Sequence, residues 1–165
     1  MCLLQQYQTL IVGAAGFTGV IVTLMTNAWL ARAQHRRQVQ HERTVLRVAL
    51  RAELEAVAES YRDRIELIGS PGRHDGLLYP LDTMSQVYKS MIGRIGLLTA
   101  IEVKAVLQAY LLIEQLPDRV KILASSDRKT EPGFVHIAAS NFGPVQKMHE
   151  NYLTDVDAAL AAIPP

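Results

Sequence analysis

The chain has 165 residues, a formal net charge of +1, and a hydrophobic fraction of 49%. The near-neutral charge argues against a dedicated nucleic-acid binder, which is usually strongly basic. The single cysteine, Cys2, excludes an internal disulfide and any metal site built from several cysteines. This length accommodates one membrane segment and one domain with a modest core.

The first 31 residues carry no charged side chain. Within them, residues 10–29 form an apolar stretch of about the length that a helix needs to cross the hydrocarbon core of a bilayer. A signal peptide needs a basic N-terminal region, which is missing here, and a small-residue cleavage site, which residues 28–31 match poorly. We therefore predict an N-terminal tail and a retained transmembrane helix in residues 1–31.

Small and weakly polar residues recur along this stretch at spacings of three and four. They are Ala15, Gly16, Gly19, Thr23 and Asn27. Small side chains let two transmembrane backbones approach closely, and Thr or Asn can donate hydrogen bonds across the contact. We expect this face to pack against another transmembrane helix, either from a second copy or from a different protein.

Basic residues follow the apolar stretch, and none precedes it. The first six are Arg32, Arg36, Arg37, Arg43, Arg47 and Arg51. The positive-inside rule then places the N-terminus outside and residues 32–165 in the cytoplasm. The first three arginines lie close enough to the expected span to contact anionic lipid headgroups. The other three need a different partner, either an acidic protein surface or glutamates of the chain's own domain.

Residues 32–69 predict a basic and amphipathic helix beside the membrane. They contain no glycine or proline before Gly69, and apolar residues recur every three or four positions from Leu46 to Ile68. This spacing predicts one buried helix face. The segment Gly69-Ser70-Pro71-Gly72 ends the helix.

Residues 70–165 predict a cytosolic helical bundle. A loop is expected over residues 70–81, followed by a short helix over 82–92 that Asp82 caps. Thr99 and Glu102 form a capping box that opens a helix over 100–116. Because that helix is apolar nearly all round, we expect it at the centre of the bundle.

Proline punctuates the rest of this domain. Pro117 is expected to end the central helix, and a short helical piece follows to residue 124. A last helix is expected over residues 134–163, kinked or split at Gly143-Pro144. No strand is expected. The fold class is therefore all-α, with one transmembrane helix that continues into a bundle of four to five helices.

No motif in the chain specifies a reaction. The five histidines lie on separate predicted elements without the spacing of a metal site: His35, His41, His74, His136 and His149. The glycines between residues 13 and 19 superficially resemble a phosphate-binding loop, but they lie inside the expected span and no lysine accompanies them. We therefore predict no catalytic, cofactor-binding or metal-binding residue, and no enzymatic activity.

Two segments, Ala49–Val57 and Ile92–Glu114, resemble parts of uncharacterised bacterial proteins. Those proteins have one N-terminal membrane helix followed by a short cytosolic helical domain. The resemblance implies a bacterial inner-membrane location, and it implies no activity and no functional residue.

Two functions fit these features. The first is a non-enzymatic accessory, scaffold or assembly subunit of a larger membrane complex. The second is a membrane-tethered sensor or regulator whose bundle binds a ligand or a cytosolic protein. The expected partners are anionic lipid headgroups and another transmembrane helix, with no nucleic acid and no cofactor.

Overall fold

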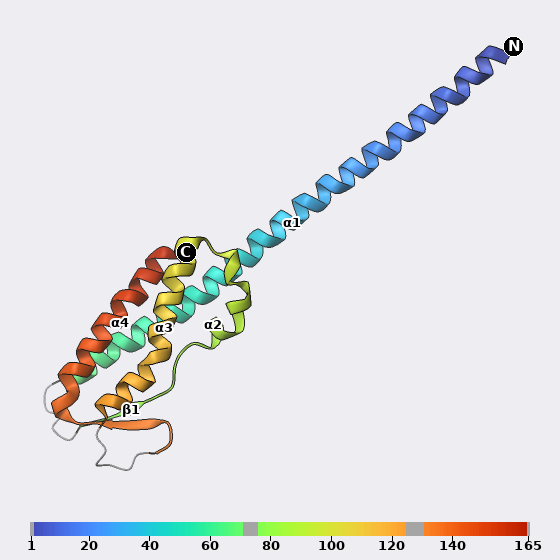
Figure 1. Ribbon diagram of the computed structural model, residues 1–165. Coiled ribbons are helices and arrows are strands. Elements are labelled where there is room, and N and C mark those ends of the chain that lie inside the picture. The colour runs from blue at the N-terminus through green and yellow to red at the C-terminus, as the bar shows by residue number, and fades with distance from the viewer. Residues whose placement is uncertain (1, 71–75, 125–130, 165) are drawn as a thin grey trace. The chain divides into compact units, whose positions relative to one another are not determined.

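The computed structural model describes the backbone of residues 2–70, 76–124 and 131–164 (Figure 1). It describes the side chains of those residues, except for residues 2–11 and 13–15. The described chain is mostly helical, with four α-helices and a small two-stranded sheet. Its internal contacts divide it into two units, residues 1–42 and residues 43–165.

The first unit belongs to helix α1 (Cys2–Gly69). Between residues 12 and 30, the large apolar side chains that the structure describes are between 37% and 71% exposed, and they are Val12, Phe17, Val20, Ile21, Val22, Leu24, Met25, Trp29 and Leu30. In the part of the chain that the structure describes, no helix has the length and apolar character needed to cross a membrane. The expected span, residues 10–29, includes positions 10, 11 and 13–15, whose side chains lie outside the described residues.

The second unit is a helical bundle. The part of α1 from residue 43 packs with α3 (Ala100–Leu123) and α4 (Phe142–Ala162). The buried face that the sequence predicts on α1 is confirmed, and α1 ends at Gly69 as expected. The predicted face consists of Leu46, Leu50, Leu54, Val57, Tyr61, Ile65 and Ile68. All of these are buried except Ile65, which is half-exposed. A continuous apolar row on α1 therefore forms one wall of the core.

Two short strands pair where the sequence analysis expects a loop and the start of a helix. β1 (Leu77–Pro80) and β2 (Phe134–Ile137) run antiparallel, with Leu77 opposite Ile137. The expectation of no strand is wrong because the pairing joins segments more than fifty residues apart, which local periodicity does not reveal. The sheet closes one end of the core, where Tyr79 and Ile137 are each 1% exposed.

The last helix is shorter than predicted. A 3-10 turn η2 (Ala139–Asn141) follows the strand, and α4 begins at Phe142. Pro144 therefore lies in the first turn, where its missing N–H removes no intrahelical hydrogen bond. Val145 and Val156, both fully buried, keep the predicted apolar face of this helix in the core.

Helix α3 differs from its prediction in length and in exposure. It continues through Pro117 to Leu123, because Leu116 and Val120 remain packed in the core on either side of the proline. The separate piece predicted over 118–124 is therefore part of α3. Its outer face is exposed, with Leu107 at 42% and Leu111 at 59%, so α3 is not surrounded by the bundle.

The segment before α3 also differs from the single short helix predicted over residues 82–92. Helix α2 (Gln86–Met91) begins four residues after Asp82, so Asp82 does not cap it, and the 3-10 helix η1 (Ile92–Leu97) follows directly. The capping box at the start of α3 is confirmed: the Glu102 carboxylate accepts from the Thr99 N–H at 2.7 Å.

Candidate functional site

Arg43, Arg47 and Arg51 lie against polar groups of the bundle itself. Arg43 Nε donates to the Leu97 carbonyl oxygen at 2.5 Å, at the end of η1. Arg51 Nη1 donates to the Ile163 carbonyl oxygen at 2.8 Å, at the end of α4. These two contacts join α1 to the ends of two other elements.

Arg47 forms an ion pair with the capping residue of α3. Its Nε lies 2.7 Å from Glu102 Oε1, and its Nη2 lies 3.1 Å from Glu102 Oε2. Burial alone would raise the pKa of Glu102, but hydrogen bonds from Arg47 and Thr99 outweigh it and lower the pKa. The carboxylate thus serves the helix cap and the arginine together.

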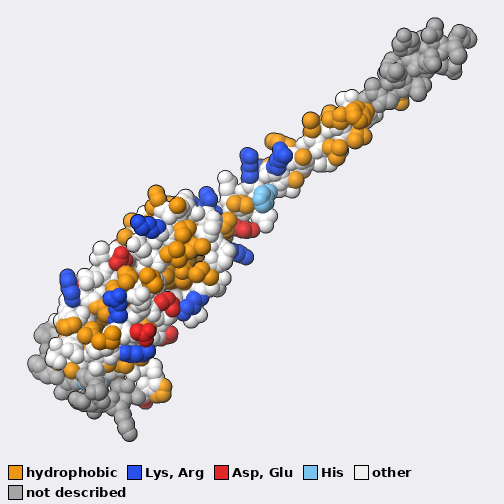
Figure 2. Space-filling view, in the orientation of Figure 1, with side chains coloured by type: hydrophobic (Ala, Val, Ile, Leu, Met, Phe, Trp, Pro, Cys, Tyr) orange, Lys and Arg blue, Asp and Glu red, His pale blue; other side chains and the backbone are white. Residues whose placement is uncertain are grey.

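The three arginines nearest the expected span are placed differently. Arg32, Arg36 and Arg37 are exposed, and none makes an ion pair or hydrogen bond with a described residue. Figure 2 shows Lys and Arg side chains following the hydrophobic part of this helix. The structure therefore separates the six-arginine row into three exposed members and three that contact the bundle.

The two glycines of the small-residue face have space around them in the described chain. A Cβ atom built at Gly16 or Gly19 meets nothing within 4 Å. Thr23 and Asn27 are exposed, and the Thr23 hydroxyl donates to the Gly19 carbonyl oxygen at 2.8 Å. The side chain of Ala15 lies outside the described residues. The described chain does not itself cover the two glycines, Thr23 or Asn27, so they are open to a partner.

A buried polar cluster surrounds His149 at the sheet end of the core. His149 Nδ1 donates to the Val145 carbonyl oxygen at 2.8 Å, which leaves Nε2 to accept from the Tyr79 hydroxyl at 2.8 Å. The Tyr79 hydroxyl in turn accepts from Arg64, whose guanidinium lies 4.6 Å from the centre of the Tyr79 ring. The ring of Tyr61 contacts His149 edge-on.

This environment keeps His149 neutral. Burial lowers its pKa to about 4, and the positive charge of Arg64 adds to that effect. An imidazole with this pKa and with both nitrogens engaged is not a general base near pH 7. The spacing of α4 places His149 on the buried face, but the sequence does not reveal its partners Tyr79 and Arg64.

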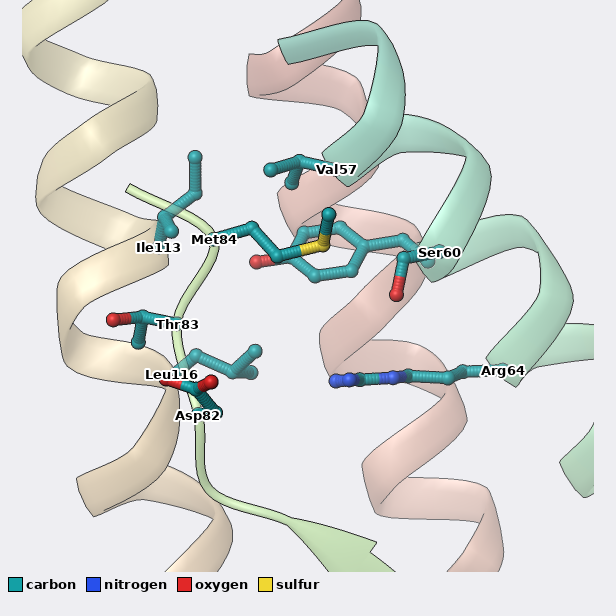
Figure 3. Close-up of a pocket in the computed structure, with 9 residues that line it drawn as sticks. Val57, Ser60, Arg64, Asp82, Thr83, Met84, Ile113 and Leu116 are labelled. Atoms are coloured by element: carbon teal, nitrogen blue, oxygen red, sulfur yellow. The ribbon is translucent and has the colours of Figure 1, made fainter. Parts of the chain in front are cut away.

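A small pocket adjoins this cluster (Figure 3). Its walls are Val57, Ser60, Tyr61, Arg64, Asp82, Thr83, Met84, Ile113 and Leu116. Figure 3 shows Arg64 reaching across it toward the segment that carries Asp82 and Thr83. The space for the centre of a water molecule is about 10 Å³, so the pocket fits a single water and no organic ligand. Among the described residues, the buried Tyr61 hydroxyl has no hydrogen-bond partner, so it is a suitable donor to a water in this pocket.

Glu53 is a second polar junction, and no local sequence pattern predicts it. Its carboxylate accepts from the N–H groups of Val87 at 2.7 Å and Tyr88 at 2.9 Å, and from the Tyr110 hydroxyl at 2.6 Å. Helix α2 has no side-chain cap of its own, so Glu53 of α1 supplies one. The rings of Tyr88 and Tyr110 stack at 4.0 Å between centres.

Among the described residues, no group of three histidine, cysteine, aspartate or glutamate side chains is arranged to hold a metal ion. In comparisons with protein-family models, curated proteins and solved structures, none matches this chain. The polar clusters of the second unit therefore have to be interpreted from their own geometry.

Proposed function

We propose that this chain is a non-enzymatic, single-pass membrane protein that acts as an accessory, scaffold or assembly subunit of a larger membrane complex. Residues 10–29 cross the bilayer, which is the bacterial inner membrane, and the bundle lies in the cytoplasm. The observation that carries this proposal is the exposure of large apolar side chains on every side of the charge-free helix. A helix in water needs a polar face, which this one lacks, whereas a helix in lipid needs none.

Hydrogen bonding in this helix supports the same proposal. Thr23 and Thr26 each donate to the carbonyl oxygen four residues earlier, both at 2.8 Å. A hydroxyl that is bonded to its own helix needs no water partner, so it can enter hydrocarbon at low cost. The two threonines are therefore polar residues of the expected span whose hydroxyl groups already have hydrogen-bond acceptors.

The second unit supports a structural role over a catalytic one. Glu53, His149 and the three arginines that contact the bundle hold helices and strands together, and the pocket beside Tyr61 fits a single water. Because this pocket is too small for an organic ligand, the alternative function, a membrane-tethered sensor, requires that the bundle bind a protein and not a small molecule in this pocket. The exposed apolar side chains of α3, including Leu111, are the feature that favours this alternative.

Extraction and native purification test the main proposal. The full chain should stay with membranes through an alkaline carbonate wash, whereas release into the supernatant would contradict the anchor. After solubilisation in a mild detergent, a stoichiometric membrane partner should co-purify. A lone monomer would contradict the accessory function while leaving the anchor standing.

Reporter fusions test the orientation. A reporter after Pro165 should be active only if it works in the cytoplasm, because the basic residues follow the span. The combined changes Gln5→Lys, Gln6→Lys, Arg36→Gln and Arg37→Gln should reduce or invert that preference. A periplasmic C-terminus in the unmodified chain would contradict the orientation and the cytoplasmic location of the bundle.

A further inference from the structure

One end of the bundle combines exposed apolar and basic side chains. The chain turns there from η1 into the first turn of α3, and we call residues 92–104 the η1–α3 corner (Figure 1). The hydrogen bond from Arg43 to the Leu97 carbonyl oxygen fixes this corner to the start of the second unit. The corner therefore lies beside residue 43, where the second unit begins.

The surface of the corner is apolar and positive. Ile92, the first residue of η1, is 48% exposed, and Ile101, in the first turn of α3, is 76% exposed. Arg94 and Lys104 are exposed, and neither makes an ion pair or hydrogen bond with a described residue. The only acidic residue of the corner, Glu102, is buried and paired with Arg47. The corner thus offers isoleucines and free cations with no exposed carboxylate.

We propose that the η1–α3 corner docks on the anionic lipid surface of the membrane that anchors the chain. Isoleucine side chains enter the boundary between headgroups and acyl chains, and arginine or lysine beside them binds lipid phosphates. An acidic protein surface would match the charge, but it would not account for two protruding isoleucines beside the cations. This inference rests on the proposed membrane anchor.

Because the segment between the expected span and the second unit is short, a low affinity of the η1–α3 corner for lipid is sufficient for docking. Residues 30–42 separate the expected span from Arg43, and thirteen helical residues extend about 20 Å. A tether of this length holds the corner at a high local concentration near the lipid. Docking then needs little intrinsic affinity.

A fluorescent probe at two exposed isoleucines of α3 tests the docking. The full chain with Cys2→Ser receives either Ile101→Cys, in the corner, or Ile122→Cys, which is 82% exposed near the other end of the helix. Each cysteine is labelled with an environment-sensitive dye, and the protein is reconstituted in phosphatidylcholine vesicles with or without phosphatidylglycerol. We expect a blue shift and a severalfold rise in emission only at position 101 and only with phosphatidylglycerol. Equal spectra at the two positions would overturn the proposal.

Charge variants identify the source of the attraction. Arg94→Gln with Lys104→Gln should weaken docking about 30-fold, because each basic residue near an anionic surface contributes roughly a fivefold factor. Lys147→Gln, a change at an exposed lysine of α4, should have no effect. An equal effect of both variants would overturn the proposal. If the chain stays with membranes through a carbonate wash but the dye at position 101 has the emission spectrum of an aqueous environment, docking is overturned and the anchor stands. If the chain is released from the membrane, the anchor and the docking are overturned together.

Discussion

Arg47 and Glu102 form a two-point ion pair that joins α1 to the capping box of α3, with Nε–Oε1 and Nη2–Oε2 distances of 2.7 and 3.1 Å. The carboxylate side chain is 4% exposed and the arginine side chain is 24% exposed. Glu102 also accepts from the Thr99 N–H, so its loss affects a helix start and a contact between helices at once.

Glu102→Gln should separate these two roles, because glutamine still fits a capping box but cannot pair with a cation. We expect a loss of about 1–3 kcal/mol in the free energy of unfolding, since Arg47 keeps some access to water. The folded-state pKa of Glu102 is lowered, so its stabilisation is present above the ordinary pKa of 4.5 and is lost as the pH falls below it. Urea titrations of the full chain, followed by tyrosine near-UV circular dichroism, should show a smaller acid loss in the variant.

Leu107→Ala should cost less than about 1.5 kcal/mol, because Leu107 is 42% exposed and its removal leaves no closed cavity. Ile113→Ala, at a 1% exposed position on the same helix, should cost about 2–5 kcal/mol. The composition of α3 alone predicts a large loss at Leu107, so this comparison measures directly which face of α3 is inside. Similar losses at the two positions in a urea titration would contradict the exposure of the Leu107 face.

The sequence predicts most successfully those features whose cause is local. The end of α1 at Gly69 and the capping box at Thr99 each depend on residues within one helical turn. The buried row from Leu46 to Ile68 follows from the period of a single helix. In each case the determining residues are adjacent on one element, so the pattern is visible without a partner.

The features that the sequence misses depend on partners far along the chain. β1 and β2 are too short to show alternation, and their pairing exists only because the fold brings residues 77–80 and 134–137 together. Glu53 stands among exposed charges of α1, and nothing nearby marks it as the cap of α2. A proline such as Pro117 usually ends a helix, but the burial of Leu116 and Val120 outweighs the cost of the lost helical hydrogen bond here.

His149 should make the stability of the second unit depend on pH. Its folded-state pKa is lowered to about 4 from 6.5, so the unfolded chain binds more protons between these values. Stability should therefore be full above about pH 6.5 and fall by on the order of 3 kcal/mol as the pH drops to 4. His149→Gln keeps hydrogen-bonding groups without titrating, and it should flatten this window in urea titrations. An unchanged pH profile in the variant would contradict the buried, neutral imidazole.

Tyr110→Phe should destabilise the second unit by about 1–3 kcal/mol, because it removes the hydroxyl that donates to Glu53 in a partly buried site. The Tyr88 ring can still stack on phenylalanine, so the loss reports the hydrogen bond and not the aromatic contact. Glu53→Ala should cost more, because two N–H groups of α2 also lose their acceptor. Equal losses from the two variants in a denaturant titration would mean that Glu53 does not cap α2.

Gly19→Ile should weaken association of the chain with its membrane partner, or with a second copy, while leaving membrane retention intact. A Cβ atom at Gly19 meets no described atom within 4 Å outside its own helical turns, so a larger side chain there has room within the described chain. Isoleucine is apolar enough to stay in lipid, but its bulk prevents the close backbone approach that small residues permit. Val20→Ile, at a neighbouring position that is 58% exposed, is the matched control and should be close to neutral. Co-purification from mild detergent measures both variants. Equal retention of the partner by the two variants would leave the helix as an anchor only, and recognition would then have to come from the exposed arginines Arg32, Arg36 and Arg37, where added salt should release the partner.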